Sequence, residues 1–187
     1  EDVDKALTAF NQALTLAPDS SAALMGLARV HKEQDKLDEA RSAVDRALAL
    51  APEKAEVHSL SGDIYTKQEE YGQAEAAYRQ ALALDEKLLS AHLGMGQLQM
   101  ELGQLGESEA SFERAMEIDP KENAPHVFMA QARKIKPADP SLARLEAEVP
   151  QLDAMSGSKA MSLHFALGKA YDDLKEYDKA FPHFAAG

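Results

Sequence analysis

Histidine is the residue type whose spacing in this chain most directly suggests chemistry. His58, His92 and His126 follow one another at equal intervals, and His164 holds the matching place in the last unit. A zinc ion needs its nitrogen ligands at about 2.0–2.1 Å, whereas the axes of packed helices lie about 8–10 Å apart. We therefore expect neither a metal nor another cofactor at this column of histidines.

Two interpretations of the histidine column remain open. In the first, each imidazole fills space between helices and has no further role. In the second, half-buried imidazoles loosen the stack in acid, because a buried neutral histidine resists protonation and its charging costs stability.

Small residues recur at the same interval and indicate the elements that hold the histidines. Ala28, Gly62, Gly96 and Ala130 are evenly spaced, and Gly168 follows after a slightly longer interval. Small side chains let two helix backbones approach, and a bulky column fills the space between them. A period of about 34 residues is typical of a stacked array of helix pairs. The other columns are Ala6, Ala40, Ala74 and Ser108; Ala13, Ala47, Ala81 and Ala115; and the bulky Phe10, Val44, Tyr78 and Phe112.

A further column predicts where the helices end. Proline cannot donate the next backbone hydrogen bond, so Pro18, Pro52 and Pro120 are expected to stop a helix. We expect the apolar residue before each stop to be buried and to complete the apolar side of its helix pair. These apolar residues are Leu16, Leu50, Leu84 and Ile118.

The columns resemble those of the tetratricopeptide repeat, a unit of two antiparallel helices in about 34 residues. Residues 55–88 match it best, with Gly62, Tyr65, Tyr71, Ala74, Tyr78 and Ala81 in place. The resemblance implies an all-α fold, a right-handed superhelical solenoid of antiparallel helix pairs, with residues 1–187 forming one array fragment. Its parts are a second helix at 3–16, repeats at 21–54, 55–88 and 89–122, an irregular repeat at 123–157 and a truncated final repeat at 158–187. Because the array begins with a second helix, we expect it to be part of a larger protein.

The same resemblance implies that the first helices of the repeats line a concave groove. Short polar and apolar groups mixed along such a groove suit an extended peptide or a partner helix better than a metabolite. We therefore expect a protein–protein interaction scaffold whose partner is a protein or peptide. The residues expected to line the groove are Met25, Arg29, Ser59, Asp63, Leu93, Gln97, Val127 and Gln131.

One known ligand of such repeats is not expected here. Repeat proteins that bind the acidic tails of heat-shock chaperones carry Lys and Asn at five places on these helices. The matching places hold one cation, Arg29, and otherwise Met25, Leu60, Ser90 and Gly94.

Composition argues against other classes of function. The net charge of −12 would repel a phosphate backbone, so we expect no nucleic-acid partner. No stretch approaches the roughly 18 apolar residues of a membrane span, and the absence of cysteine fits the cytoplasm. The sequence lacks a phosphate-binding loop, a His-Glu-x-x-His motif, a Gly-x-Ser-x-Gly motif and a cysteine nucleophile, so we do not expect this segment to be an enzyme.

The period breaks after residue 134. Helix propensity stops at Lys136-Pro137, restarts after Asp139-Pro140, stops again at Pro150 and resumes near Ser158, which lengthens that unit by four residues. Residues 120–187 resemble the last repeats of bacterial proteins in which such an array leads into a sulfotransferase domain. This resemblance implies an alternative function, in which the segment positions a substrate for a catalytic domain beyond residue 187.

Overall fold

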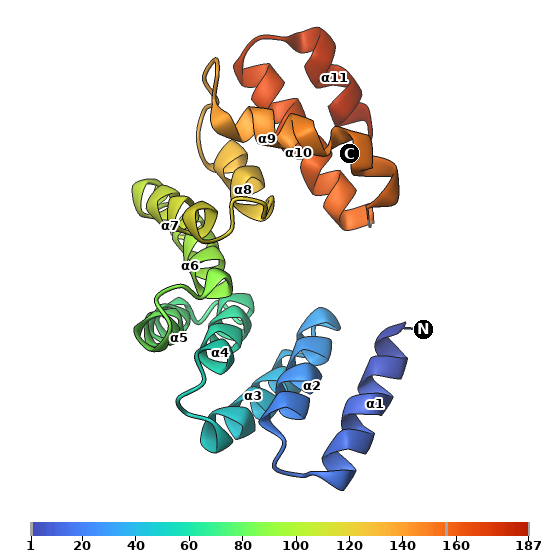
Figure 1. Ribbon diagram of the computed structural model, residues 1–187, viewed down its shortest axis with the longest axis vertical. Coiled ribbons are helices and arrows are strands. Elements are labelled where there is room, and N and C mark those ends of the chain that lie inside the picture. Colours follow the sequence, from blue (N-terminus) through green and yellow to red (C-terminus); the bar gives the residue numbers. More distant parts are fainter. Residues whose placement is uncertain (1, 156, 187) are drawn as a thin grey trace. The chain divides into compact units, whose positions relative to one another are not determined.

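The computed structural model describes residues 2–155 and 157–186 (Figure 1). These residues form eleven α-helices and one 3-10 helix, and none of them lies in a strand. The expected all-α class is therefore confirmed. The chain divides into two compact units, residues 1–98 and residues 99–187, each of which has its own packing.

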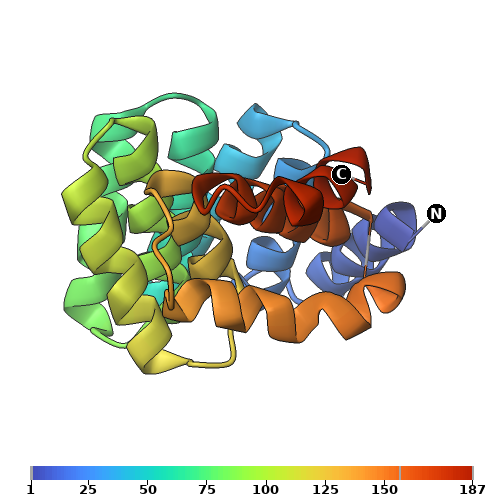
Figure 2. The ribbon, with the colours of Figure 1, turned by 90° about the horizontal axis from the view of Figure 1, so that it is seen from above.

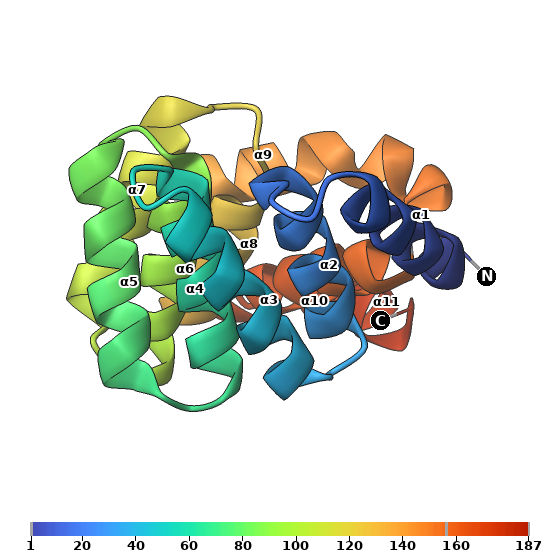
Figure 3. The same cartoon turned by 90° about the horizontal axis from the view of Figure 1, so that it is seen from below.

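Short turns connect the helices of the first unit. Contacts join α1 to α2, α2 to α3, α3 to α4 and α4 to α5, and the first helices α2 and α4 also touch. Figure 3 shows α4 and α5 side by side. The bounds are α1 Asp2–Leu16, α2 Ser21–Glu33, α3 Leu37–Leu50, α4 Ala55–Lys67, α5 Tyr71–Leu84 and α6 Leu89–Glu101, the last of which ends in the second unit.

The terminal leucine column marks helix ends but not burial. Helices α1, α3 and α5 end at Leu16, Leu50 and Leu84. Leu16 is 88% exposed and Leu50 is 43% exposed, so the expectation that both would close the apolar side is wrong. Each is the last helical residue, and it lies beside a turn rather than beside the next helix.

The turn between the two helices of a repeat has a recurring geometry. Asp35, Glu69 and Gly103 hold the same place in successive repeats and have φ angles of 59°, 60° and 73°. In the first of these turns the Lys36 amide donates to the His31 carbonyl at 2.9 Å, which closes the end of α2. Glycine adopts this left-handed backbone freely, so Asp35 and Glu69 adopt it at a cost that Gly103 avoids.

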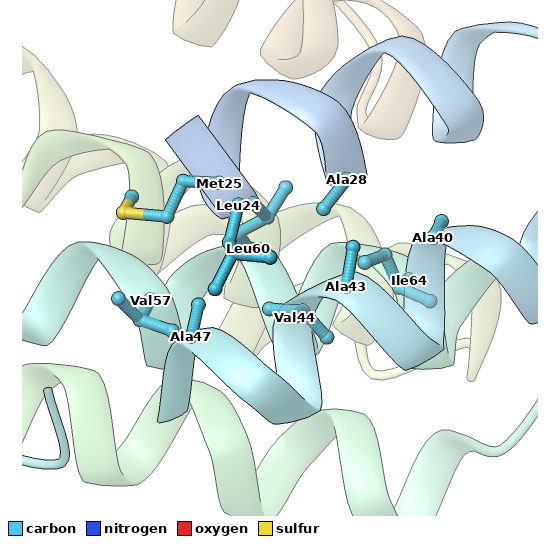
Figure 4. Close-up of a cluster of buried hydrophobic side chains, with 10 residues drawn as sticks. All are labelled: Leu24, Met25, Ala28, Ala40, Ala43, Val44, Ala47, Val57, Leu60 and Ile64. Atoms are coloured by element: carbon cyan, nitrogen blue, oxygen red, sulfur yellow. The ribbon is translucent and has the colours of Figure 1, made fainter. Parts of the chain in front are cut away.

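The core between α2, α3 and α4 contains four residues of the predicted columns, namely Ala28, Ala40, Val44 and Ala47 (Figure 4). Ala28, Ala40 and Ala47 are completely buried, and Val44 is 1% exposed. Larger side chains such as Leu24 and Ile64 fill the remaining space. The prediction that small residues bring these helices together is confirmed.

In the next repeat, the ring of Tyr78 lies against two glycines on two different helices. A Cβ added to Gly62 of α4 would lie 2.6 Å from this ring, and one added to Gly94 of α6 would come closer still. Tyr78 is only 2% exposed. Phe10 has the same relation to Gly26 of α2. These glycines are therefore needed for close approach.

The second unit combines a repeat-like pair with an irregular segment. Contacts join α7 to α8, α8 to α9, α8 to α10, α9 to α10 and α10 to α11. In Figure 2, α10 and α11 are coloured orange-red to dark red. Within the described residues, no helix combines the length and apolarity of a membrane crossing. The bounds are α7 Leu105–Ile118, α8 Ala124–Ala132, α9 Pro140–Glu148, η1 Val149–Ala154, α10 Gly157–Asp173 and α11 Tyr177–Ala186.

A buried ion pair stabilises the start of the irregular segment. Both Arg133 amino groups donate to the Asp139 carboxylate, at 2.6 and 3.2 Å, and the same carboxylate accepts the Ser141 amide at 3.0 Å. Asp139 is thereby the N-cap of α9, and Pro140 occupies its first turn. Burial alone would raise the pKa of Asp139, but these hydrogen bonds and the charge of Arg133 outweigh it and lower the pKa.

Candidate functional site

In the first unit, the six residues predicted to line the groove lie at different depths on the first helices. Arg29 and Gln97 are exposed, and Asp63 and Leu93 are half-buried. Met25 and Ser59 are buried, with 6% and 2% of their surface exposed, and Met25 belongs to the core cluster. The surface that a partner can touch therefore consists of the first four residues, which we call the first-helix surface: Arg29, Asp63, Leu93 and Gln97.

Asp63 is held in a fixed orientation by two neighbours. Lys32 Nζ lies 2.6 Å from its Oδ2, and the Tyr78 hydroxyl donates to its Oδ1 at 2.9 Å. Lys32 comes from α2 and Tyr78 from α5, so three helices meet at this carboxylate. A side chain fixed in this way loses little conformational freedom when a ligand binds.

A second polar contact connects the first helices α4 and α6. Ser59 Oγ and Ser90 Oγ lie 2.9 Å apart, in hydrogen-bond distance. Ser59 and Gly94 are buried, and Leu60 is 3% exposed. Of the places that a carboxylate clamp would use, Arg29 alone offers an exposed cation.

In the second unit, the predicted groove residues Val127 and Gln131 line a pocket of about 470 Å³. Both come from α8, and Lys159, Ser162 and Leu163 of α10 also line the pocket. Glu148 and Met155, which flank η1, complete the enclosure. The sequence pattern carried no signal for Glu148 or Met155 beyond the four extra residues of the irregular unit.

The four histidines of the column lie in different environments. His58 Nε2 lies 2.7 Å from the Pro52 carbonyl, and His92 Nε2 lies 2.9 Å from the Glu86 carbonyl. Each of these two rings thus holds the turn that precedes its own helix. Such a bond is donated by a ring that carries a proton on Nε2, which is true of one neutral tautomer and of the charged form.

The other two histidines of the column have different partners. His126 is 8% exposed, and its Nδ1 lies 3.4 Å from Ser141 Oγ. Burial and the charge of Arg144 lower the pKa of His126, against a smaller opposing effect of Asp139. His164 Nδ1 lies 2.9 Å from Nδ1 of His183, whose pKa is lowered by burial and by His164. Sequence reasoning missed His183, which has no place in the column.

No group of three or more His, Cys, Asp or Glu side chains in the described part of the chain is placed to hold a metal ion. The geometry is that of a helical-repeat surface with one pocket in its irregular part.

Comparison with known families assigns the repeats. Residues 1–64 and 89–122 match models described as tetratricopeptide repeat, and residues 62–103 match a model described as TPR repeat. Residues 1–122 of this chain are therefore tetratricopeptide repeats. No curated protein has a significantly matching sequence.

Solved structures of low sequence identity share the fold. PilW, described as a widely conserved type IV pilus biogenesis factor, has a TM-score of 0.75 and 19% identity, covering 98% of this chain and 84% of that chain. MamA has a TM-score of 0.59 and 17% identity, covering 95% and 92%. The first TPR of Spaghetti (RPAP3), bound to the HSP90 peptide SRMEEVD, has a TM-score of 0.56 and 20% identity, covering 60% and 89%.

Proposed function

We propose that this chain is a non-catalytic protein–protein interaction scaffold that binds a peptide or partner segment on its first helices. The observation that carries the proposal is that Arg29 and Gln97 are exposed and Asp63 and Leu93 half-buried on the first helices, which leaves polar and apolar groups accessible. The contacts from Lys32 and Tyr78 hold the Asp63 side chain of this surface in one orientation before a ligand arrives. Preorganisation lowers the entropic cost of binding.

The similar repeat domain that binds the HSP90 peptide SRMEEVD supports the class of function but not that ligand. Binding an acidic peptide needs several cations. Among the five positions that correspond to the chaperone-binding residues of such repeats, Arg29 alone carries an exposed cation. The net charge of −12 also opposes the approach of an anionic peptide. We therefore expect the partner segment to be neutral or basic.

A peptide selected from a displayed library against the whole chain provides the test. Its affinity is then measured by calorimetry for Arg29→Glu and Gln97→Glu, with Arg46→Glu on the exposed surface of α3 as the matched control. We expect at least a roughly tenfold change, about 1.4 kcal/mol, for the first two variants, which is a gain for a basic peptide because the added charge attracts it and a loss for a neutral one, and no change for the control. Loss with Arg46→Glu alone would place the binding surface on the second helices and end the proposal.

Three further expectations stay predictions. They are the cytoplasmic location, the absence of a nucleic-acid partner and the alternative function as the substrate-positioning arm of a sulfotransferase. The last depends on the resemblance of residues 120–187, and no contact within the described residues adds to it.

A further inference from the structure

The pocket in the second unit owes its enclosure to the irregular segment. Regular repeats are joined by four residues, as between Leu50 of α3 and Ala55 of α4. Eight residues separate Glu148 of α9 from Gly157 of α10, and they include η1. Glu148 at the end of α9 and Met155 of this connection both line the pocket, together with residues of α8 and α10. Figure 1 shows the path of the chain from α8 through α9 to α10.

The walls of this pocket are mainly apolar. Val127 and Phe128 line it from α8, Leu163 from α10 and Met155 from the connecting segment. Phe128 is fixed in position because its ring stacks on Phe112 at a centroid distance of 5.2 Å. A volume of about 470 Å³ lies within the range of pockets that bind small ligands or side chains.

One ionised group at the pocket lacks adequate partners. The Glu148 side chain is 9% exposed, and its single ion pair, with Arg144 Nη2, is long at 3.3 Å. Among the residues that the structure describes, none donates a hydrogen bond to this carboxylate. The same Arg144 nitrogen instead donates to the Lys121 carbonyl at 2.7 Å. A buried carboxylate in this state gains from a further cationic donor, because charge-assisted bonds of about 2.7–2.9 Å are the strong ones.

We propose that this pocket receives a long cationic side chain, arginine or lysine, from a partner peptide. The methylene stem lies along Val127, Phe128 and Leu163, and the charged head reaches Glu148. Arginine and lysine combine such a stem with such a head, whereas a purely apolar side chain would leave Glu148 with its long ion pair to Arg144 alone. The net charge of −12 attracts a cationic segment. The inference deepens the proposed function, since it names the residue by which a partner is anchored.

Lys159 lies at the same pocket and opposes a second cation. Its side chain is exposed, so its ammonium group can move away when a ligand enters. Removing its charge should therefore tighten binding of a cationic side chain. A gain in affinity when the Lys159 charge is removed would indicate an electrostatic site, whereas a purely apolar site would show no gain.

The test uses the whole chain and four short probes, Ac-Ala-X-Ala-NH₂ with X as Arg, Lys, Met or Glu. Methyl NMR follows Val127, Met155 and Leu163 while each probe is added to about 10 mM. We expect saturable shifts with Arg and Lys, shifts at least about tenfold weaker with Met, and none with Glu. Equal binding of the Met and Arg probes, or no shift with any probe, would overturn the proposal.

Three variants complete the test. Glu148→Gln keeps the shape of the pocket and should weaken Arg-probe binding at least about tenfold, whereas Lys159→Ala should strengthen it. Ser162→Trp fills the pocket, and Met161→Trp on exposed surface of the same helix is its matched control. Unchanged binding by Glu148→Gln would contradict the proposal.

An Arg29→Glu chain measured in the same way separates this inference from the proposed function. Probe binding that persists in Arg29→Glu supports the pocket even if the library peptide does not use the first-helix surface. A library peptide that needs Arg29 while no probe enters the pocket would refute the pocket alone.

Discussion

The two compact units meet the same packing requirement with different residues. At one position of the repeat the first unit has Gly26, Leu60 and Gly94, and the two glycines receive the rings of Phe10 and Tyr78. The second unit has Phe128 at that position, and its ring stacks on Phe112 with a centroid distance of 5.2 Å. Two rings face to face need more room than a ring against a glycine. The repeat therefore accommodates either a glycine or a second ring against its aromatic residue.

The ion pairs of the two units differ in burial. Arg41 of α3 donates to both oxygens of Glu70, at 2.9 and 3.0 Å, and each side chain is 33% exposed. Arg133 and Asp139 make a similar two-bond contact in the second unit, but the Asp139 side chain is only 5% exposed. The regular unit thus depends mainly on apolar fit, and the irregular unit adds buried charge.

The largest expected effect tests the apolar fit of the first unit. Tyr78→Ala removes a ring that is 2% exposed, and the loss of stability should be about 3–5 kcal/mol. Tyr78→Phe keeps the ring and removes the hydroxyl with its bond to Asp63 and its longer contact to Thr66 Oγ1, so it should cost about 1 kcal/mol. Denaturant unfolding measures both values. Equal losses would mean that the hydroxyl, rather than the ring, stabilises this repeat.

The next effect tests the close approach at glycine. Gly94→Ala places a methyl group against the Tyr78 ring, and overpacking of this kind should cost about 1–3 kcal/mol. Gly72→Ala in α5 is the matched control, because no atom lies within 4 Å of the added Cβ. The control should stabilise the chain by about 0.5–1 kcal/mol through helix propensity. Thermal melting of the two variants should therefore shift in opposite directions.

The features that could be predicted from the sequence are those that recur. Ala28, Ala40 and Ala47 are buried because each unit repeats the same contact between helices, so a column of small residues records that contact. The helix ends at Leu50 and Leu84 followed from the same register. The recurring columns alone were enough to predict the fold class and the burial of these alanines.

Contacts that occur once leave no column and could not be predicted. Lys32 and Asp63 are 31 residues apart and form an ion pair that no recurring column of residues predicted. The buried state of Met25 depends on how α2 is rotated, which an eight-residue groove pattern does not specify. Glu148 became a candidate only when the path of the eight-residue connection was known.

A smaller effect compares the two ion pairs. Asp139→Ala removes the partner of Arg133 together with the N-cap of α9, so we expect a loss of about 2 kcal/mol. Glu70→Ala removes a pair that is one-third exposed and should cost less than about 1 kcal/mol. Because the folded-state pKa of Asp139 is lowered, its contribution is present above pH 3.8 and is lost as pH falls below that value. Urea unfolding at neutral and acidic pH checks both statements, and equal losses at neutral pH would remove the distinction between the units.

The smallest expected effect concerns the histidines in mild acid. Burial and Arg144 lower the pKa of His126, so the unfolded chain takes up a proton near 6.5 before the folded chain does. Stability is then complete above pH 6.5 and decreases as pH falls toward the folded-state value. His183 acts in the same direction, because burial and His164 lower its pKa. Acid should therefore weaken the second unit.

His58 and His92 lie in the regular repeats, where their Nε2 atoms are 2.7 and 2.9 Å from the Pro52 and Glu86 carbonyls. Melting at about pH 7.5 and pH 5.5 should show a smaller acid-induced loss in His126→Gln than in the wild type. His58→Gln removes the contact with the Pro52 carbonyl in a regular repeat and is the control, whose acid-induced loss should equal that of the wild type. If His58→Gln abolished the acid response instead, protonation would act on the regular repeats, and the column would share one environment after all.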